Sequence, residues 1–120
     1  MPKTILIVED FKDTRILMKF LLEQLGYEVF EAEDGFKAVE MVKRLIPDLI
    51  LMDMALPLIN GLSATKIIRQ FKETSEIPII AFTASGQYLY QQAIEAGCNE
   101  LISKPLDVDK LQPVLDQYLA

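Results

Sequence analysis

The chain has 120 residues, which is enough for one domain with a single core and too few for two. Hydrophobic residues make up 51% and charged residues 25%, a balance that excludes an intrinsically disordered chain. Twelve Lys and Arg against eighteen Asp and Glu give a net charge of −6, which opposes contact with nucleic-acid phosphates. We therefore expect one domain over residues 1–120, no output domain and no direct nucleic-acid partner.

The cysteine and histidine content excludes further classes of protein. Cys98 is the only cysteine and there is no histidine, so neither an intramolecular disulfide nor a thiolate or imidazole zinc site can form. The apolar run 5–8 is too short for a signal peptide, and no later run approaches the roughly 20 apolar residues of a membrane span. We expect a cytoplasmic protein without a membrane partner.

Short apolar runs alternate with longer segments of helical spacing along the whole chain. This alternation predicts stacked βα units, an α/β fold with a parallel sheet covered by helices on both faces. The five predicted strands are residues 4–8, 28–32, 49–52, 79–82 and 101–103. The five predicted helices carry the stripes Leu17-Leu21-Leu25, Ala38-Val42-Leu45-Ile46, Ala64-Ile67-Ile68-Phe71, Leu89-Tyr90-Ala93-Ile94 and Leu111-Val114-Leu115-Tyr118.

The last predicted helix contains a proline. Pro113 would remove a backbone hydrogen bond and cost about 3 kcal/mol or more in a helix interior. The helix therefore either begins late or kinks, while Asp107 as an N-cap favours an early start. The sequence leaves both alternatives open.

Polar side chains follow four of the predicted strands at the point where each strand ends. Glu9 and Asp10 follow the first strand, Asp53 the third, Thr83 the fourth and Lys104 the fifth. Because the carboxyl ends of parallel strands share one edge of the sheet, we expect these side chains to converge there. Like charges about 4 Å apart repel by about 4 kcal/mol at an effective dielectric near 20, so three carboxylates need more than one ammonium group to balance them. The oxygen-rich set predicts Mg²⁺.

An aspartate beside Mg²⁺ can act as a nucleophile toward phosphorus and form an aspartyl phosphate. Asp53 is the predicted nucleophile because it stands alone at its strand end. We expect the backbone amides of Met54 and Ala84 to bind phosphoryl oxygens, and the carbonyl of Ala55 to bind the metal.

Together these residues resemble the receiver domain of bacterial-type two-component response regulators, the chemotaxis-regulator-like family, over essentially the whole chain. The matching motifs are Glu9-Asp10 after Ile5-Leu6-Ile7-Val8, Asp53 followed by Pro57 and Asn60-Gly61, Thr83-Ala84 after a strand begun by Pro78, and Lys104-Pro105 after Ala96-Gly97.

The resemblance implies a flavodoxin-like sheet in the order 2-1-3-4-5. It also implies Mg²⁺ held by Asp10, Asp53 and the Ala55 carbonyl, with Glu9 acting through water. A histidine kinase or histidine phosphotransfer protein would transfer its phosphoryl group to Asp53, and the domain would act on a downstream protein effector as a monomer or weak dimer. The domain would then be a switch and not a turnover enzyme.

The switching residues implied by the resemblance are Thr83, Leu101 and Pro105. Thr83 would move toward the phosphoryl group, and the Lys104-Pro105 bond would be cis, although only about 5–6% of X-Pro bonds are. Two positions depart from the common pattern of the family. Leu101 stands where such receivers usually carry Tyr or Phe, and Ala55 stands where many carry a polar side chain.

Three other functions compete with this interpretation. A haloacid-dehalogenase-type phosphohydrolase needs a second Asp at the position of Ala55, and a flavodoxin-type carrier would find its phosphate repelled by Glu9 and Asp10. A degenerate receiver that only docks would not need all five key positions filled. Nucleotide-binding glycine motifs are absent from the sequence.

Overall fold

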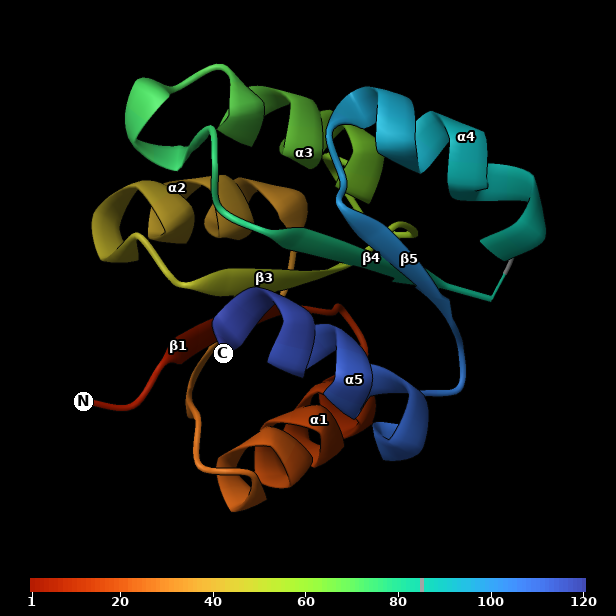
Figure 1. The fold of residues 1–120 in the computed structure, drawn as a ribbon. Helices are drawn as coiled ribbons and strands as arrows, with labels where there is room; N and C mark the ends of the chain where they lie inside the picture. Colours follow the sequence, from red (N-terminus) through yellow and green to blue (C-terminus); the bar gives the residue numbers. More distant parts are fainter. Residues whose placement is uncertain (85) are drawn as a thin grey trace.

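The computed structural model describes residues 1–84 and 86–120, which form a three-layered α/β domain (Figure 1). Among these residues the strands are β1 (Thr4–Val8), β2 (Glu28–Ala32), β3 (Leu49–Asp53), β4 (Ile79–Thr83) and β5 (Glu100–Ser103). The helices are α1 (Lys12–Gln24), α2 (Gly35–Leu45), α3 (Gly61–Arg69), α4 (Gly86–Ala96) and α5 (Val108–Leu119), with a short 3-10 turn at Lys72–Thr74.

The strands form one parallel sheet in the order β2-β1-β3-β4-β5, as predicted. The register aligns the strand ends. Val8 lies opposite Met52, the next residue Asp53 lies opposite Phe82, and Thr83 lies opposite Ser103. The residues that follow the strands are therefore brought to one edge.

Helices cover both faces of the sheet. Figure 1 shows α2, α3 and α4 on one face and α1 and α5 on the other. Successive residues of a strand point to opposite faces, so Leu6 and Val8 join one buried cluster with α2, α3 and α4, while Ile5 and Ile7 join the other with α1 and α5. Burial on both faces explains why the three central strands β1, β3 and β4 are nearly continuous apolar runs, while the edge strands β2 and β5 are mixed.

The sequence predicted the wrong buried face for α1. Leu17, placed on the buried stripe by the sequence, has 57% of its surface exposed, whereas Met18 has 1% and Leu22 none. One residue step turns a helix by about 100°, so the buried face is centred one position further along. The helix is apolar around much of its circumference, which is why spacing alone chose the wrong stripe.

Three other helix details are decided by the structure. The third helix, α3, ends at Arg69. Phe71, which the sequence placed on the stripe of this helix, lies after it and directly before the 3-10 turn. The last helix takes the early start, with the Asp107 carboxylate accepting from the Asp109 amide and Pro113 inside the helix. Among the described residues, no helix is both long enough and apolar enough to cross a membrane.

Candidate functional site

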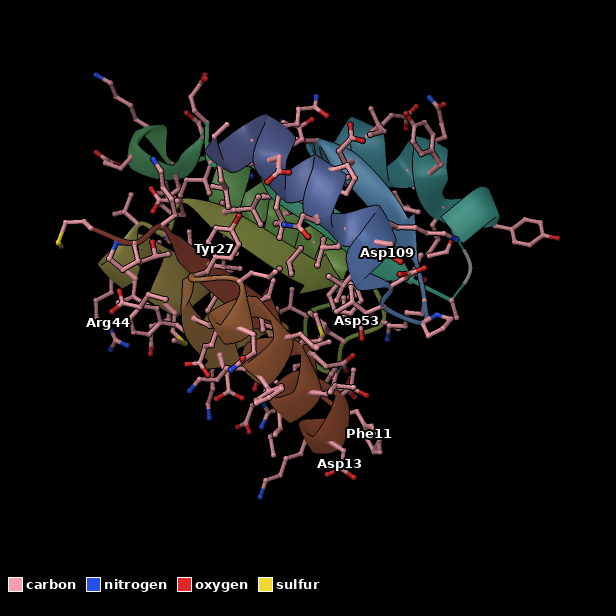
Figure 2. All side chains as sticks on the ribbon, turned by 60° about the horizontal axis from the view of Figure 1, so that its bottom comes forward. Phe11, Asp13, Tyr27, Arg44, Asp53 and Asp109 are labelled. Atoms are coloured by element: carbon pink, nitrogen blue, oxygen red, sulfur yellow. The ribbon has the colours of Figure 1, made fainter. Side chains whose placement is uncertain are left out.

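Three carboxylates from two strand ends meet at the carboxyl edge of the sheet. Glu9 and Asp10 follow β1 and Asp53 is the last residue of β3, and one carboxylate oxygen from each lies within 4.8 Å of the others. Glu9 and Asp53 are each only 1% exposed, while Asp10 faces solvent. Figure 2 shows Asp53 at the same end of the molecule as Phe11 and Asp109, far from Arg44. The predicted convergence of acidic groups is confirmed.

Lys104 brings a positive charge to these carboxylates from the segment after β5. Its Nζ lies 2.9 Å from Asp53 Oδ2 and 3.3 Å from Glu9 Oε1. Burial by itself would lower the pKa of Lys104, but the hydrogen bond to Asp53 and the nearby negative charges outweigh it and raise the pKa. The backbone N–H of Lys104 also donates to the Thr83 carbonyl at 2.9 Å, which ties this segment to the end of β4.

Glu9 is held by both its backbone and its side chain. Its N–H donates to the Ala32 carbonyl at 3.1 Å, and its Oε2 accepts from the Phe11 N–H at 2.9 Å. Burial raises the pKa of the Glu9 carboxyl, and the neighbouring Asp10 and Asp53 raise it further. The ionised Glu9 is therefore in an unfavourable environment that additional positive charge would relieve.

The charge balance and ligand chemistry of the cluster fit a divalent cation. Three carboxylates against the single ammonium of Lys104 leave an excess of two negative charges. Carboxylate oxygens are the ligands that Mg²⁺ takes in proteins, commonly with waters and a phosphate completing the shell. The side chains present are thus suited to bind such an ion.

The backbone N–H groups after Asp53 make hydrogen bonds that the sequence did not predict. The Ala55 N–H donates to Asp53 Oδ1 at 3.0 Å, a contact the sequence did not suggest. The Met54 N–H donates to the Phe82 carbonyl at 3.1 Å and so continues the sheet pairing. The phosphoryl contacts of the Met54 and Ala84 amides, and the metal contact of the Ala55 carbonyl, stay predictions.

A glycine allows the next helix to approach Asp53. A Cβ built on Gly61, the first residue of α3, would lie 2.3 Å from the Asp53 carbonyl oxygen, so a larger residue would displace the strand end. Asn60 caps the helix by accepting from the Ser63 N–H. In the sequence the Asn60-Gly61 pair is one of the matching receiver motifs, but the close approach of Gly61 to the Asp53 carbonyl is seen only in the fold.

Of the three residues predicted to switch, Thr83 lies on β4, Leu101 lies on β5, and Pro105 lies in the segment that follows β5. Thr83 is buried as the last residue of β4, and Leu101 on β5 is partly buried against the α2, α3 and α4 cluster. A Cβ on Gly86, where α4 begins, would come within 2.8 Å of the Leu101 side chain. The Lys104-Pro105 peptide bond is cis, as the family resemblance implied.

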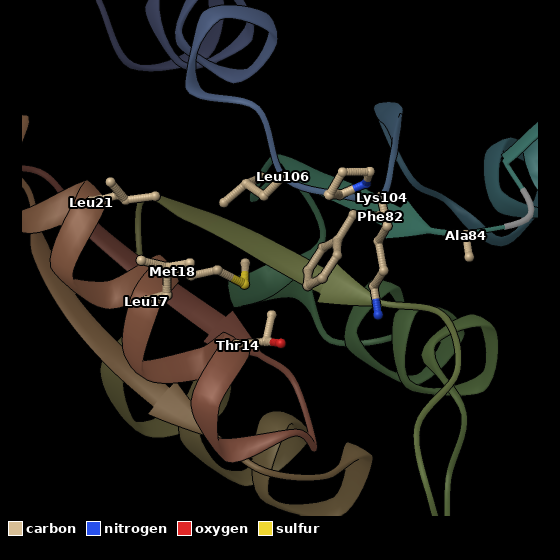
Figure 3. A pocket seen from close by; sticks show the side chains of 9 residues that line it. Thr14, Leu17, Met18, Leu21, Phe82, Ala84, Lys104 and Leu106 are labelled. Carbon is tan, nitrogen blue, oxygen red and sulfur yellow. The ribbon is translucent and has the colours of Figure 1, made fainter.

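A cavity of about 490 Å³ opens beside Lys104, between α1 and the segment that joins β5 to α5 (Figure 3). Its walls are mainly apolar and include Leu17, Met18 and Leu21 from α1, with Phe82 and Leu106 facing them. The exposed side chain of Leu17 therefore forms part of the cavity wall. Further exposed apolar side chains near this end of the molecule are Phe11, Ile16 and Phe20.

Comparison with known proteins agrees with the geometry. Residues 5–116 match the model of the response regulator receiver domain. The polar-differentiation response regulator DivK of Brucella anthropi is 38% identical over 120 residues, covering 99% of this chain and 98% of DivK.

Two solved structures extend the comparison. The receiver domain of the sensor histidine kinase PA1611 from Pseudomonas aeruginosa, crystallised with a magnesium ion coordinated in its active-site cleft, is 36% identical, with a TM-score of 0.92 and 98% of each chain covered. The receiver domain of Ssk1 from Saccharomyces cerevisiae, solved in complex with the histidine phosphotransfer protein Ypd1, is 27% identical, with a TM-score of 0.90, covering 98% of this chain and 88% of that one. The chain belongs to the response regulator receiver domain family.

Proposed function

We propose that this receiver domain accepts a phosphoryl group on Asp53 from a histidine kinase or histidine phosphotransfer protein, in a Mg²⁺-dependent reaction, and then changes its binding surface for a protein effector. The observation that carries the proposal is the placement of Asp53. It is buried at the end of β3, 2.9 Å from the Lys104 ammonium and beside two further carboxylates.

In this proposal Asp10, Asp53 and the Ala55 carbonyl hold Mg²⁺, and Glu9 acts through water. Support comes from the excess negative charge of the cluster and from the magnesium ion in the similar PA1611 receiver domain. When bound, the ion supplies charge neutralisation between an anionic nucleophile and an anionic phosphoryl group.

The chain's own residues would perform the transfer. An Asp53 carboxylate oxygen attacks phosphorus, a new O–P bond forms, and the bond from phosphorus to the donor imidazole nitrogen breaks with its electron pair returning to that nitrogen. Lys104 would then contact a phosphoryl oxygen, and the Thr83 hydroxyl and the Ala84 amide would bind the others. The Met54 amide would join them only by leaving its hydrogen bond to the Phe82 carbonyl. Ala55 supplies no acid or base, which favours a switch over a phosphatase that turns over.

The donor must bring the histidine, because this chain has none. The similar Ssk1 receiver was solved with a histidine phosphotransfer protein, which supports the same class of donor here. The exposed Phe11, Leu17 and Phe20 on and beside α1 offer an apolar surface that a donor protein would cover.

The proposed output lies around β4, α4 and β5. Phosphorylation replaces the ionised Asp53 carboxylate with an acyl phosphate of about −1.5 to −2 charges, a net gain of up to about one negative charge, and Thr83 and Lys104 are the groups placed to respond to it. Leu101 packs where α4 begins, and α4 carries the exposed Tyr88 and Tyr90, so a shift there would change an exposed aromatic surface.

Phosphotransfer from a protein donor tests the proposal. A histidine phosphotransfer protein carrying ³²P-phosphohistidine is mixed with the wild type, Asp53→Asn or Asp13→Asn, with Mg²⁺ or with EDTA. We expect label on the wild type and on Asp13→Asn, an exposed residue of α1, only with Mg²⁺, and none on Asp53→Asn. Labelling of Asp53→Asn at the wild-type level would overturn the assignment.

A further inference from the structure

Arg15 on α1 links the acidic pair Glu9-Asp10, which follows β1, to Glu31 on β2. It lies in the first turns of α1, and its Nη1 donates to the Glu9 backbone carbonyl at 2.9 Å. Its Nε donates to Glu31 Oε1 on β2 at 3.1 Å. The Arg15 side chain is only 14% exposed, so both contacts are made largely out of solvent.

The Glu9 carbonyl belongs to the peptide bond that links Glu9 to Asp10. A peptide unit is planar, so fixing its carbonyl oxygen fixes the direction of the Asp10 N–H and the start of the Asp10 residue. Among the described residues, Arg15 makes the one hydrogen bond to the Glu9 carbonyl, whereas the Glu9 N–H is held by Ala32 and the Glu9 carboxylate by Phe11 and Lys104. Arg15 therefore restrains the peptide unit that joins the two adjacent acidic residues.

The charge of Arg15 is compensated by its own partner. Glu31 accepts from the guanidinium, so the pair has no net charge beside the carboxylate cluster. An unpaired cation at this position would repel a divalent ion, but a guanidinium neutralised by Glu31 can orient the loop with little electrostatic cost. Lys19 also reaches Glu31, at 3.5 Å, and the structure gives it no contact with Glu9.

We infer that Arg15 is a positioning residue for the divalent cation: it holds the Glu9–Asp10 peptide so that both carboxylates face the ion. This inference rests on the proposed Mg²⁺ site. Partners that orient metal ligands typically contribute 10–100-fold to metal affinity, so the contribution of Arg15 should be measurable.

Calorimetric titration of Mg²⁺ into the unphosphorylated protein tests the inference without any phosphotransfer. The variants are Arg15→Gln, which removes the guanidinium, Arg15→Lys, which keeps the charge but not the two-pronged geometry, and Lys19→Gln as the matched control. We expect Mg²⁺ affinity to fall about tenfold in both Arg15 variants and to change less than twofold in Lys19→Gln.

The outcomes separate positioning from charge. If Arg15 acted only as a nearby cation, Arg15→Gln would bind Mg²⁺ more tightly and Arg15→Lys would match the wild type, and either result would overturn the inference. Equal weakening in Lys19→Gln would overturn it as well. If the wild type bound no Mg²⁺, the proposed metal site itself would fail, which is a distinct result.

A fourth variant guards against misfolding. Glu31→Gln leaves Arg15 in place but weakens its anchor on β2, and we expect an intermediate loss of Mg²⁺ affinity. Thermal unfolding of each variant in EDTA identifies the temperature at which all are folded for the titration. Wild-type Mg²⁺ affinity in a folded Glu31→Gln would also contradict the inference, because anchoring of Arg15 on β2 would then be unnecessary.

Discussion

The interior of the sheet and its carboxyl edge lie on the same strands but are built from opposite chemistry. Along β1 the residues Ile5 to Val8 are fully buried and apolar, and the next residue, Glu9, is as deeply buried but charged. Along β3 the apolar run ends one residue before Asp53, which is 1% exposed. Burial of the last apolar side chain stabilises the fold, whereas burial of the carboxylate that follows it opposes folding because the charge loses its solvation.

This difference shows how the domain divides its tasks. The interior gains stability by removing apolar surface from water, about 25 cal/mol per Å². The edge concentrates three carboxylates around one ammonium, and the resulting electrostatic repulsion is one that a bound cation would relieve. Substitutions in the two regions should therefore differ in kind, and removing a carboxylate from the edge should change stability in the opposite direction to removing an apolar side chain from the interior.

The largest stability effect is expected in the interior. Leu51 is 1% exposed and belongs to the cluster beneath α1 and α5, so Leu51→Ala leaves a cavity and should cost about 2–5 kcal/mol. Urea unfolding measures the loss, and labelling of Asp53 by acetyl phosphate in the folded fraction should persist. If Leu51→Ala kept its stability but lost labelling, the interior would contribute directly to the chemistry of the edge, and the contrast between the two regions would be wrong.

A smaller loss of stability is expected from Lys104→Ala. This change leaves Glu9 and Asp53 without their ammonium partner and should cost about 1–3 kcal/mol in EDTA. We expect Asp53 still to be phosphorylated in Mg²⁺, while the phosphorylation-induced amide chemical-shift changes in β4, α4 and β5 are lost. Wild-type shift changes in this variant would refute the coupling role of Lys104.

The smallest effect has the opposite sign. Glu9→Gln removes an ionised carboxylate from a buried site and should stabilise the metal-free protein by about 1 kcal/mol at pH 7. Because the folded protein raises the pKa of Glu9, its ionised form opposes folding above that pKa, so the gain should shrink as the pH falls and Glu9 becomes protonated.

Thermal unfolding in EDTA and in Mg²⁺ checks this prediction. The advantage of Glu9→Gln should diminish in Mg²⁺, since the wild type then regains a cation beside Glu9. A lower melting temperature for Glu9→Gln in EDTA would show that Glu9 contributes to the fold, and the contrast between interior and edge would not hold at this residue.

The sequence predicted the sheet and the acidic cluster well because both depend on simple patterns. Continuous apolar runs locate buried parallel strands, and the residues that end them share one edge by topology. The strands β3 and β4 each run one residue beyond the prediction, to Asp53 and Thr83, because polarity at a position does not reveal burial.

Other features required the three-dimensional structure. The facing of α1 could not be read from its spacing because Leu17 and Met18 are adjacent and both apolar, and only packing buries one of them. Arg15 is six residues from Glu9 and 16 from Glu31, and no motif links the three. The approach of Gly61 to Asp53 depends in the same way on a loop that folds back.

The central claim is that Asp53 takes a phosphoryl group with the help of a divalent cation. The most direct measurement is intact mass after incubation of the wild type and Asp53→Asn with acetyl phosphate, in Mg²⁺ and in EDTA. We expect a mass gain of one phosphoryl group in the wild type when acetyl phosphate and Mg²⁺ are both present, and no gain in EDTA or in Asp53→Asn. A gain of the same size in Asp53→Asn, or in the wild type with EDTA, would contradict it.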